Sequence, residues 1–352
     1  MSDAAPIGVG IIGLGFMGRT HLTAYAAACA AGFPCRLVAV CDARPERRRG
    51  RTAASGQREL TSAVTAPGAL FDPSVVHTYA DPHALLADAD VELVSICTYT
   101  DTHTDLAVAA LQAGKHVLVE KPVAVSSAEV RRVVEAAARA PGQLCMPALC
   151  MRFWPGWSWL KEQIDGRTFG PVRSASFQRL GTCPDWASEF YRDPARSGGA
   201  LVDLHLHDAD FVRFGFGDPD VVSCAGSIDH ITTTYHYEHG PLHVAAEGGW
   251  DQAGGFPFRM RYVVNFAEAT ADFDLSRQPP LLLYRPSVPE GEPVVLPPGT
   301  GYDVEIRHLL AALRPDGPRL IASIQDALAV ARLLEAERAS LETGGPVPFA
   351  VG

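Results

Sequence analysis

Residues 7–18 read IGVGIIGLGFMG, an apolar run followed at once by three spaced glycines. The run Ile7–Ile12 has the length and composition of a buried parallel strand. The glycines suit a strand-to-helix turn that brings the main chain against a pyrophosphate, with the following helix N-terminus facing the anion. We therefore expect a dinucleotide-binding turn whose contacts come from Gly13, Gly15, Phe16, Met17 and Gly18.

A second apolar run, Leu37–Cys41, ends in Asp42, about 24 residues after the last of these glycines. A carboxylate there can accept both hydroxyls of an adenosine ribose, which favours NAD. An arginine cluster follows, and it is either a solvated helix start or a contact for the 2′-phosphate of NADP, so NADP stays possible. By itself the glycine turn is also compatible with a structural turn or a methyl-donor enzyme. The cluster comprises Arg44, Arg47, Arg48, Arg49 and Arg51.

Composition limits the function classes that remain. The 352 residues are 47% hydrophobic and 20% charged, with a formal net charge of −10, so two domains with sizeable cores are expected. The acidic balance argues against nucleic acid or an anionic membrane surface as a partner. No apolar stretch reaches the roughly 20 residues of a membrane span, and no secretory signal pattern opens the chain, so we expect a cytoplasmic protein. The eight cysteines lack disulfide or zinc spacing and are expected to be reduced thiols.

The first half alternates short apolar strands with helices, as in a Rossmann domain over residues 1–150. From residue 151 to 352 the strands alternate in part and carry Thr, Tyr, Phe and Val, which predicts an α+β domain with a large, mostly antiparallel open sheet. A closing helix is expected over 323–341. The expected strands are Ile7–Ile12, Leu37–Cys41, Val91–Cys97, His116–Glu120 and Leu144–Leu149, then Val172–Leu180, Val221–Ile228, Leu242–Gly249, Arg259–Ala267 and Ala271–Leu275.

Polar residues follow two of the Rossmann strands, at the edge of the sheet where ligands bind. Lys121 comes directly after the strand that ends in Glu120, and a lysine there can polarise or exchange a proton, although a surface lysine is the simpler alternative. Glu120 could orient that lysine or contact the cofactor. The turn Thr98–His103 follows another strand, and it either lines the cofactor cleft through Thr98 and His103 or only caps the next helix.

The segment GGALVDLHLHD, residues 198–208, predicts a helix near 201–214 that begins after two glycines. Asp203 and His207 are four residues apart and would share one face of it, where the carboxylate fixes the tautomer of an imidazole suited to proton transfer near neutral pH. His205 would point elsewhere and is better explained as a packed or hydrogen-bonded histidine. No third ligand of suitable spacing follows, so no metal site is predicted.

Two aromatic stretches are candidate substrate contacts, since aromatic faces beside one charged group suit polyols and sugars. They contain Arg152 and Trp186. Both stretches could equally be core aromatics.

Taken together, these motifs resemble the glucose–fructose oxidoreductase, inositol dehydrogenase and rhizopine catabolism family (Gfo/Idh/MocA), and the resemblance covers essentially the whole chain. Its carriers are the glycine turn, the stretch AGKHVLVEKP at 113–122, the segment from Gly198 to His207, and the closing helix. Two positions depart from the family pattern. Tyr99 stands where a proline is common, and His205 stands where a glycine is common, so that His205 could even reach the substrate.

The resemblance implies hydride transfer between NAD and a secondary hydroxyl or ketone of a sugar, cyclitol or related polyol. Lys121, Asp203 and His207 become the catalytic trio, with either His207 or Lys121 moving the proton. A homodimer or homotetramer through the C-terminal sheet is also implied. Two alternatives stay open on the same fold, a non-catalytic dinucleotide-binding regulator and a glycosidase that uses bound NAD transiently.

Overall fold

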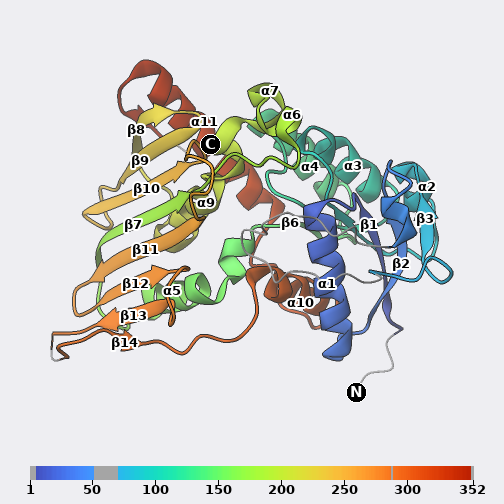
Figure 1. Ribbon diagram of the computed structural model, residues 1–352, viewed down its shortest axis with the longest axis horizontal. Coiled ribbons are helices and arrows are strands. Elements are labelled where there is room, and N and C mark those ends of the chain that lie inside the picture. The colour runs from blue at the N-terminus through green and yellow to red at the C-terminus, as the bar shows by residue number, and fades with distance from the viewer. Residues whose placement is uncertain (1–4, 51–69, 287, 350–352) are drawn as a thin grey trace. The chain divides into compact units, whose positions relative to one another are not determined.

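The computed structural model describes residues 5–50, 70–286 and 288–349 (Figure 1). Arg51 therefore lies outside the described residues. The chain divides into two compact units, which are described separately. The first comprises residues 1–124, 128–150 and 300–328, and the second comprises residues 125–127, 151–299 and 329–352. Residues 300–328, which the sequence pattern assigns to the second domain, thus belong with the first.

The first unit is built on a six-stranded, fully parallel sheet of order β3-β2-β1-β4-β5-β6. The expected Rossmann architecture is confirmed, with α1 on one face and α2, α3 and α4 on the other. The strands are β1 (Ile7–Ile12), β2 (Cys35–Cys41), β3 (His77–Tyr79), β4 (Leu93–Ile96), β5 (His116–Val119) and β6 (Cys145–Pro147), and a 3-10 turn spans Arg47–Arg49. The helices are α1 (Phe16–Ala30), α2 (Pro82–Leu86), α3 (Thr100–Gln112) and α4 (Ser127–Ala138).

Strand order reverses between β1 and β4, because the chain runs outward from β1 to β2 and β3 and then returns to β4 on the other side. The carboxyl ends of β1 and β4 therefore flank the crevice where parallel α/β sheets bind ligands. The glycine turn follows β1, the turn at Thr98 follows β4, and Lys121 follows β5 closely. The topology thus puts these motifs at one edge of one sheet.

A helix that the sequence pattern did not reveal, α10 (Gly301–Ala312), completes this unit by packing against α1. It begins with a capping box, in which the Asp303 carboxylate accepts hydrogen bonds from the Thr300 N–H at 2.9 Å and hydroxyl at 2.8 Å. Ile306, Leu309 and Leu310 form its buried face. The prolines just before it make this part of the sequence read as loop.

The second unit contains a nine-stranded sheet of order β14-β13-β12-β11-β7-β10-β9-β8-β15, antiparallel except where β7 pairs with β10. The predicted large, mostly antiparallel sheet is confirmed, although β9 and β13 were not expected. Its strands are β7 (Val172–Leu180), β8 (Val221–Ser227), β9 (His230–His236), β10 (His243–Gly249), β11 (Arg259–Phe266), β12 (Thr270–Asp274), β13 (Leu281–Tyr284), β14 (Glu292–Pro293) and β15 (Val347–Pro348).

Helices cover one face of this sheet around Trp157, which is fully buried. The Trp157 ring packs edge-on against Tyr262 and Phe273, with centroids 4.9 and 4.7 Å apart. Truncating such a core aromatic costs about 3–5 kcal/mol. The helical elements are the 3-10 turn Cys150–Phe153, α5 (Pro155–Gly166), α6 (Ser188–Tyr191), α7 (Pro194–Ser197), α8 (Gly199–Asp203), α9 (Leu206–Phe216) and α11 (Ile324–Thr343).

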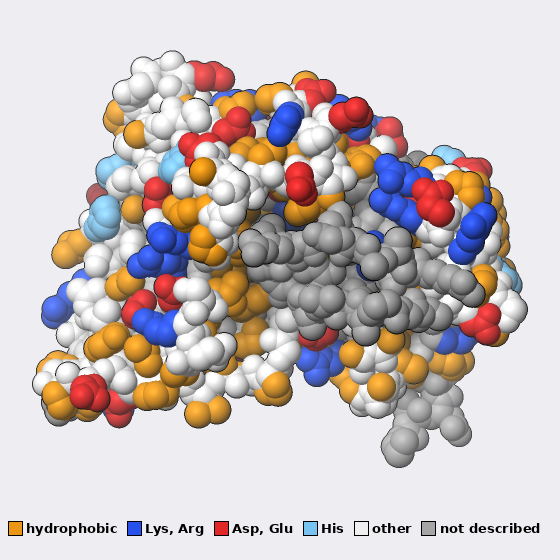
Figure 2. Space-filling model, viewed as in Figure 1, with side chains coloured by type: hydrophobic (Ala, Val, Ile, Leu, Met, Phe, Trp, Pro, Cys, Tyr) orange, Lys and Arg blue, Asp and Glu red, His pale blue; other side chains and the backbone are white. Residues whose placement is uncertain are grey.

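No helix of the part described by the structure is both long and apolar enough to span a membrane. At the surface, basic, acidic and hydrophobic side chains are interspersed over the region of the nine-stranded sheet (Figure 2).

Candidate functional site

The three glycines of the turn after β1 have different reasons to be glycine. Gly13 has a φ of +91°, and a Cβ on Gly18 would lie 1.8 Å from the Gly13 carbonyl oxygen, so the packing of the turn itself excludes side chains at both. A Cβ on Gly15 would meet only one described atom within 4 Å, the Arg47 Nη1 at 3.8 Å. Among the described residues, little therefore fills the space beside Gly15, as a turn that receives a pyrophosphate requires.

Asp42 connects the end of β2 to this turn. Its Oδ2 accepts the Leu14 N–H at 2.8 Å, and its Oδ1 accepts the Arg44 N–H at 2.8 Å. Arg47 reaches the same carboxylate, with Nη1 3.2 Å from Oδ2. Arg47 thus contacts the predicted ribose-binding carboxylate through its guanidinium, whereas Arg44 contacts it through the main-chain N–H.

Glu120, at the end of β5, makes its contacts inside the first unit. The residue is 4% exposed, Oε1 lies 2.9 Å from His21 Nε2, and Oε2 accepts the Lys121 N–H at 3.1 Å. His21 is fully buried on α1, with Nδ1 3.4 Å from Cys97 Sγ. Of the two roles open for Glu120, these contacts favour orienting the main chain at Lys121. The sequence did not single out His21, whose partner is 99 residues away.

His103 is a buried support for the same edge of the sheet. Its Nδ1 lies 2.9 Å from the Pro122 carbonyl oxygen and its Nε2 3.1 Å from the Thr98 carbonyl oxygen. Burial lowers the pKa of the ring, which favours the neutral form. The expected contact between this side chain and a dinucleotide does not fit a ring that is 1% exposed and has a carbonyl oxygen beside each nitrogen, to one of which the neutral ring donates. Its geometry instead joins the turn after β4 to the residue that follows Lys121.

Glu305, on α10, is a further buried acid of this unit that the sequence did not reveal. It is fully buried, and its pKa is raised well above the ordinary value by burial and then by the negative charge of Glu120. Both causes favour the neutral, protonated form of this carboxyl over the charged one. Glu305 lies on α10, a helix that the sequence analysis did not predict.

In the second unit, the structure corrects the expected single helix over 201–214. Asp203 is the last residue of α8, and His207 is the second residue of α9, with a turn between them. The His205 N–H donates to Ala200 at 2.8 Å, whereas the His207 N–H donates to Leu204 at 3.3 Å, so the hydrogen-bond register widens and then tightens. Asp203 and His207 are both half-buried. Because they lie on two different helices, the argument that residues four apart share one helix face does not apply to them.

Two buried arginine–carboxylate pairs hold α9 just after His207. Arg179 binds Asp208 through two hydrogen bonds of 2.9 Å, and Arg152 binds Asp210 through two of 2.9 and 2.6 Å. The predicted substrate contact of Arg152 is thus corrected. Its side chain is 2% exposed, and its guanidinium serves the packing of α9.

Trp186 remains available as a candidate substrate contact. It is half-buried, and its ring lies 5.9 Å, centroid to centroid, from Tyr191, which lies the same distance from Trp250. No group of three or more His, Cys, Asp or Glu side chains that could hold a metal ion occurs among the described residues.

Comparison with known proteins defines the class to which this fold and these motifs belong. Residues 7–147 match the model of an oxidoreductase family with an NAD-binding Rossmann fold, and residues 157–271 match the GFO/IDH/MocA C-terminal domain. The protein is thus an NAD-binding oxidoreductase by class. The chain belongs to the Gfo/Idh/MocA family, as the sequence resemblance indicates.

Its relatives include a myo-inositol 2-dehydrogenase of Thermotoga maritima, 27% identical over 69% of this chain and 70% of that protein. An inositol 2-dehydrogenase of Rhizobium meliloti is 30% identical over 60% of this chain, an alignment that spans just over half (56%) of that protein's length. A solved structure of levoglucosan dehydrogenase with NADH and L-sorbose has a TM-score of 0.81 at 21% identity, covering 99% of this chain and 100% of that one. The last similarity establishes the fold.

Proposed function

We propose that this protein is an NAD-dependent dehydrogenase that oxidises a secondary hydroxyl of a cyclitol or sugar, or reduces the corresponding ketone. The observation that carries the proposal is the pairing of a turn open at Gly15 with the lysine that follows β5 at the same sheet edge. The inositol dehydrogenases among its relatives, and the fold shared with a sugar-binding dehydrogenase, support this substrate class.

The residues present fit a dinucleotide. The main chain of Gly15, Phe16 and Met17 would hold the pyrophosphate at the N-terminus of α1, and Asp42 would accept the ribose hydroxyls. When bound, the nicotinamide accepts or donates hydride at C4. Lys121 would polarise the substrate oxygen, while His207 would take its proton with Asp203 stabilising the charged ring. Lys121 is the alternative proton acceptor.

NAD is the proposed cofactor, because the Asp42 carboxylate repels a 2′-phosphate. Arg47 partly offsets that repulsion from 3.2 Å away, so NADP remains a second cofactor to test. Titration of the apoprotein with each dinucleotide tests this ordering, which tighter binding of NADP would reverse.

The function is tested by following NADH formation with a panel of cyclitols, aldoses and sugar acids. We expect Lys121→Met and His207→Ala to abolish turnover while the cofactor still binds. Turnover that survives both substitutions would exclude the assigned roles. A requirement for only catalytic NAD, unreduced at the end, would indicate the glycosidase, and biological activity without turnover would indicate the regulator.

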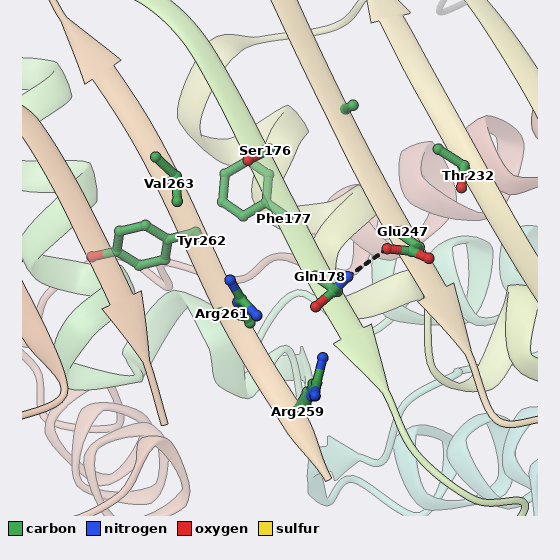
Figure 3. A pocket seen from close by; sticks show the side chains of 10 residues that line it. Ser176, Phe177, Gln178, Thr232, Glu247, Arg259, Arg261, Tyr262 and Val263 are labelled. Atoms are coloured by element: carbon green, nitrogen blue, oxygen red, sulfur yellow. Dashed lines mark hydrogen bonds between the residues drawn. The ribbon is translucent and has the colours of Figure 1, made fainter. Parts of the chain in front are cut away.

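We also propose that the open face of the nine-stranded sheet binds a second copy of this chain. The close view shows the depression on that face, with Arg259 and Arg261 near Gln178, which donates to the Glu247 carboxylate (Figure 3). Neighbouring strands place a row of small side chains beside these charges. In a twofold dimer formed through this face, the basic groups of one copy would lie opposite the acidic groups of the other. The row is Val263, Ser176, Ala245, Thr234 and Ser223.

Light scattering on the purified protein tests this proposal. We expect a dimer or tetramer for the wild type and smaller particles for Val263→Arg, whose charge would lie at the β11 end of the row. A monomeric wild type would exclude the proposed interface.

A further inference from the structure

A buried ionisable pair joins the turn between α8 and α9 to α11. His205 Nε2 lies 3.1 Å from Glu337 Oε2, and both side chains are fully buried. Thr233 Oγ1 and the Tyr235 hydroxyl, both from β9, each lie 3.3 Å from the same nitrogen. Three elements thus meet at one imidazole, namely the turn, the central sheet and helix α11. The complete burial of His205 also corrects the possibility that it reaches the substrate.

Gly248 on β10 makes room for this histidine. A Cβ on Gly248 would lie 2.8 Å from His205 Cβ and 2.9 Å from its Nδ1. Such approaches are closer than real side-chain contacts, so the imidazole fits only because position 248 has no side chain. The ring is therefore confined by main chain on one side and by Glu337 on the other.

Stability alone is a poor reason for such a pair. Removing two groups from water is costly, and apolar residues of the same volume usually stabilise a core as well as a buried ion pair does. What the pair adds is a single geometry, because the recorded polar neighbours of the imidazole, Glu337 among them, all face Nε2, whereas Nδ1 has no hydrogen-bond partner among the described residues. That geometry is imposed two residues before His207 and two residues after Asp203.

We propose that Glu337 and His205 are positioning residues that set the conformation of the turn between α8 and α9, and with it the direction of the His207 side chain relative to Asp203. Neither touches substrate, and both act through His207. Their effect on catalysis rests on the function proposed above, whereas their effect on the conformation of the His207 ring does not.

The test compares Glu337→Met, which fills the volume without an acceptor, with Glu337→Gln, which restores an oxygen. The matched control is Asp218→Asn, which removes a carboxylate from the more exposed Arg213–Asp218 pair near the other end of α9. Each variant is measured for kcat and KM, for NADH affinity, for thermal unfolding, and for the His207 ring signal in NMR spectra. The signal is assigned by its loss in His207→Asn.

We expect Glu337→Met to lower kcat by about tenfold to a hundredfold, because small misplacements of a catalytic group have effects of that size. NADH affinity should stay unchanged, the His207 signal should move, and Glu337→Gln should recover most of both. The control should match the wild type. A folded Glu337→Met with wild-type kcat and an unmoved His207 signal would overturn the proposal, since the pair would then serve folding only.

If Glu337→Met does not fold, Tyr235→Phe removes one neighbour of the same imidazole, and an unchanged kcat and His207 signal in that variant would also overturn the proposal. If the wild type turns over no polyol, the proposed function fails, yet the His207 signal in the Glu337 variants still decides whether the pair positions that ring.

Discussion

Substituting alanine at Gly15 and at Gly18 separates the two roles that glycine plays in the turn after β1. At Gly15 the added Cβ would lie 3.8 Å from Arg47 Nη1, an ordinary contact, and the backbone φ of −69° suits any residue. We therefore expect the free energy of unfolding of Gly15→Ala to stay within about 1 kcal/mol of the wild type. At Gly18 the Cβ would lie 1.8 Å from the Gly13 carbonyl oxygen, so we expect a loss of about 3 kcal/mol.

Dinucleotide binding should show a different pattern. In Gly15→Ala the methyl group occupies the space through which a pyrophosphate approaches the main chain, so affinity should fall by about tenfold to a hundredfold, or 1.4 to 2.8 kcal/mol. Urea unfolding of the apoprotein and fluorescence titration with NADH measure the two quantities on the same samples. Wild-type NADH affinity in a folded Gly15→Ala would refute the placement of the pyrophosphate at this glycine.

Three other substitutions test the buried and charged groups. Glu305→Gln should raise the free energy of unfolding at pH 7, because folding raises the pKa of the Glu305 carboxyl and the wild-type protein therefore loses stability as pH rises above the ordinary value of 4.5. In urea titrations this gain should vanish at and below pH 4.5. A gain that does not change with pH would contradict the raised pKa of Glu305. Arg179→Met leaves Asp208 buried without its partner and should cost about 3–5 kcal/mol in chemical unfolding, whereas a cost below about 1 kcal/mol would show that the pair is not desolvated. Arg47→Ala should weaken NADP binding about tenfold more than NAD binding in calorimetric titrations, and equal losses would place Arg47 away from the 2′-position.

The sequence predicts well what depends on neighbouring residues. The bounds of β1 and β7 follow from runs of apolar or alternating residues, and the glycine turn from its own spacing. The start of α10 also has a local signal, because Thr300 and Asp303 have the spacing of a capping box. The helix was nevertheless not predicted, because the prolines before it indicate a loop.

Features that depend on distant partners were not predictable in this way. Arg152 resembles a substrate contact until its partner Asp210, 58 residues away, is located beside it. His205, in the turn between α8 and α9, likewise lies beside Glu337 and in the space left by Gly248, and neither residue is visible in a window around it. Spacing along the chain located the candidate site, whereas tertiary pairs decided which side chains remain available to a ligand.

The return of α10 to the first unit has a consequence for synthesis of the protein on the ribosome. The Rossmann strands are complete by residue 150, but the helix that covers α1 lies within residues 300–328. At translation rates of about 5–20 residues per second, about 10 to 35 s pass between synthesis of residue 150 and synthesis of α10, and the surface of α1 that α10 covers stays exposed during that time. We expect nascent chains to keep that apolar surface accessible to chaperones during this interval, and a fragment ending at residue 150 to aggregate instead of folding as an independent nucleotide-binding domain.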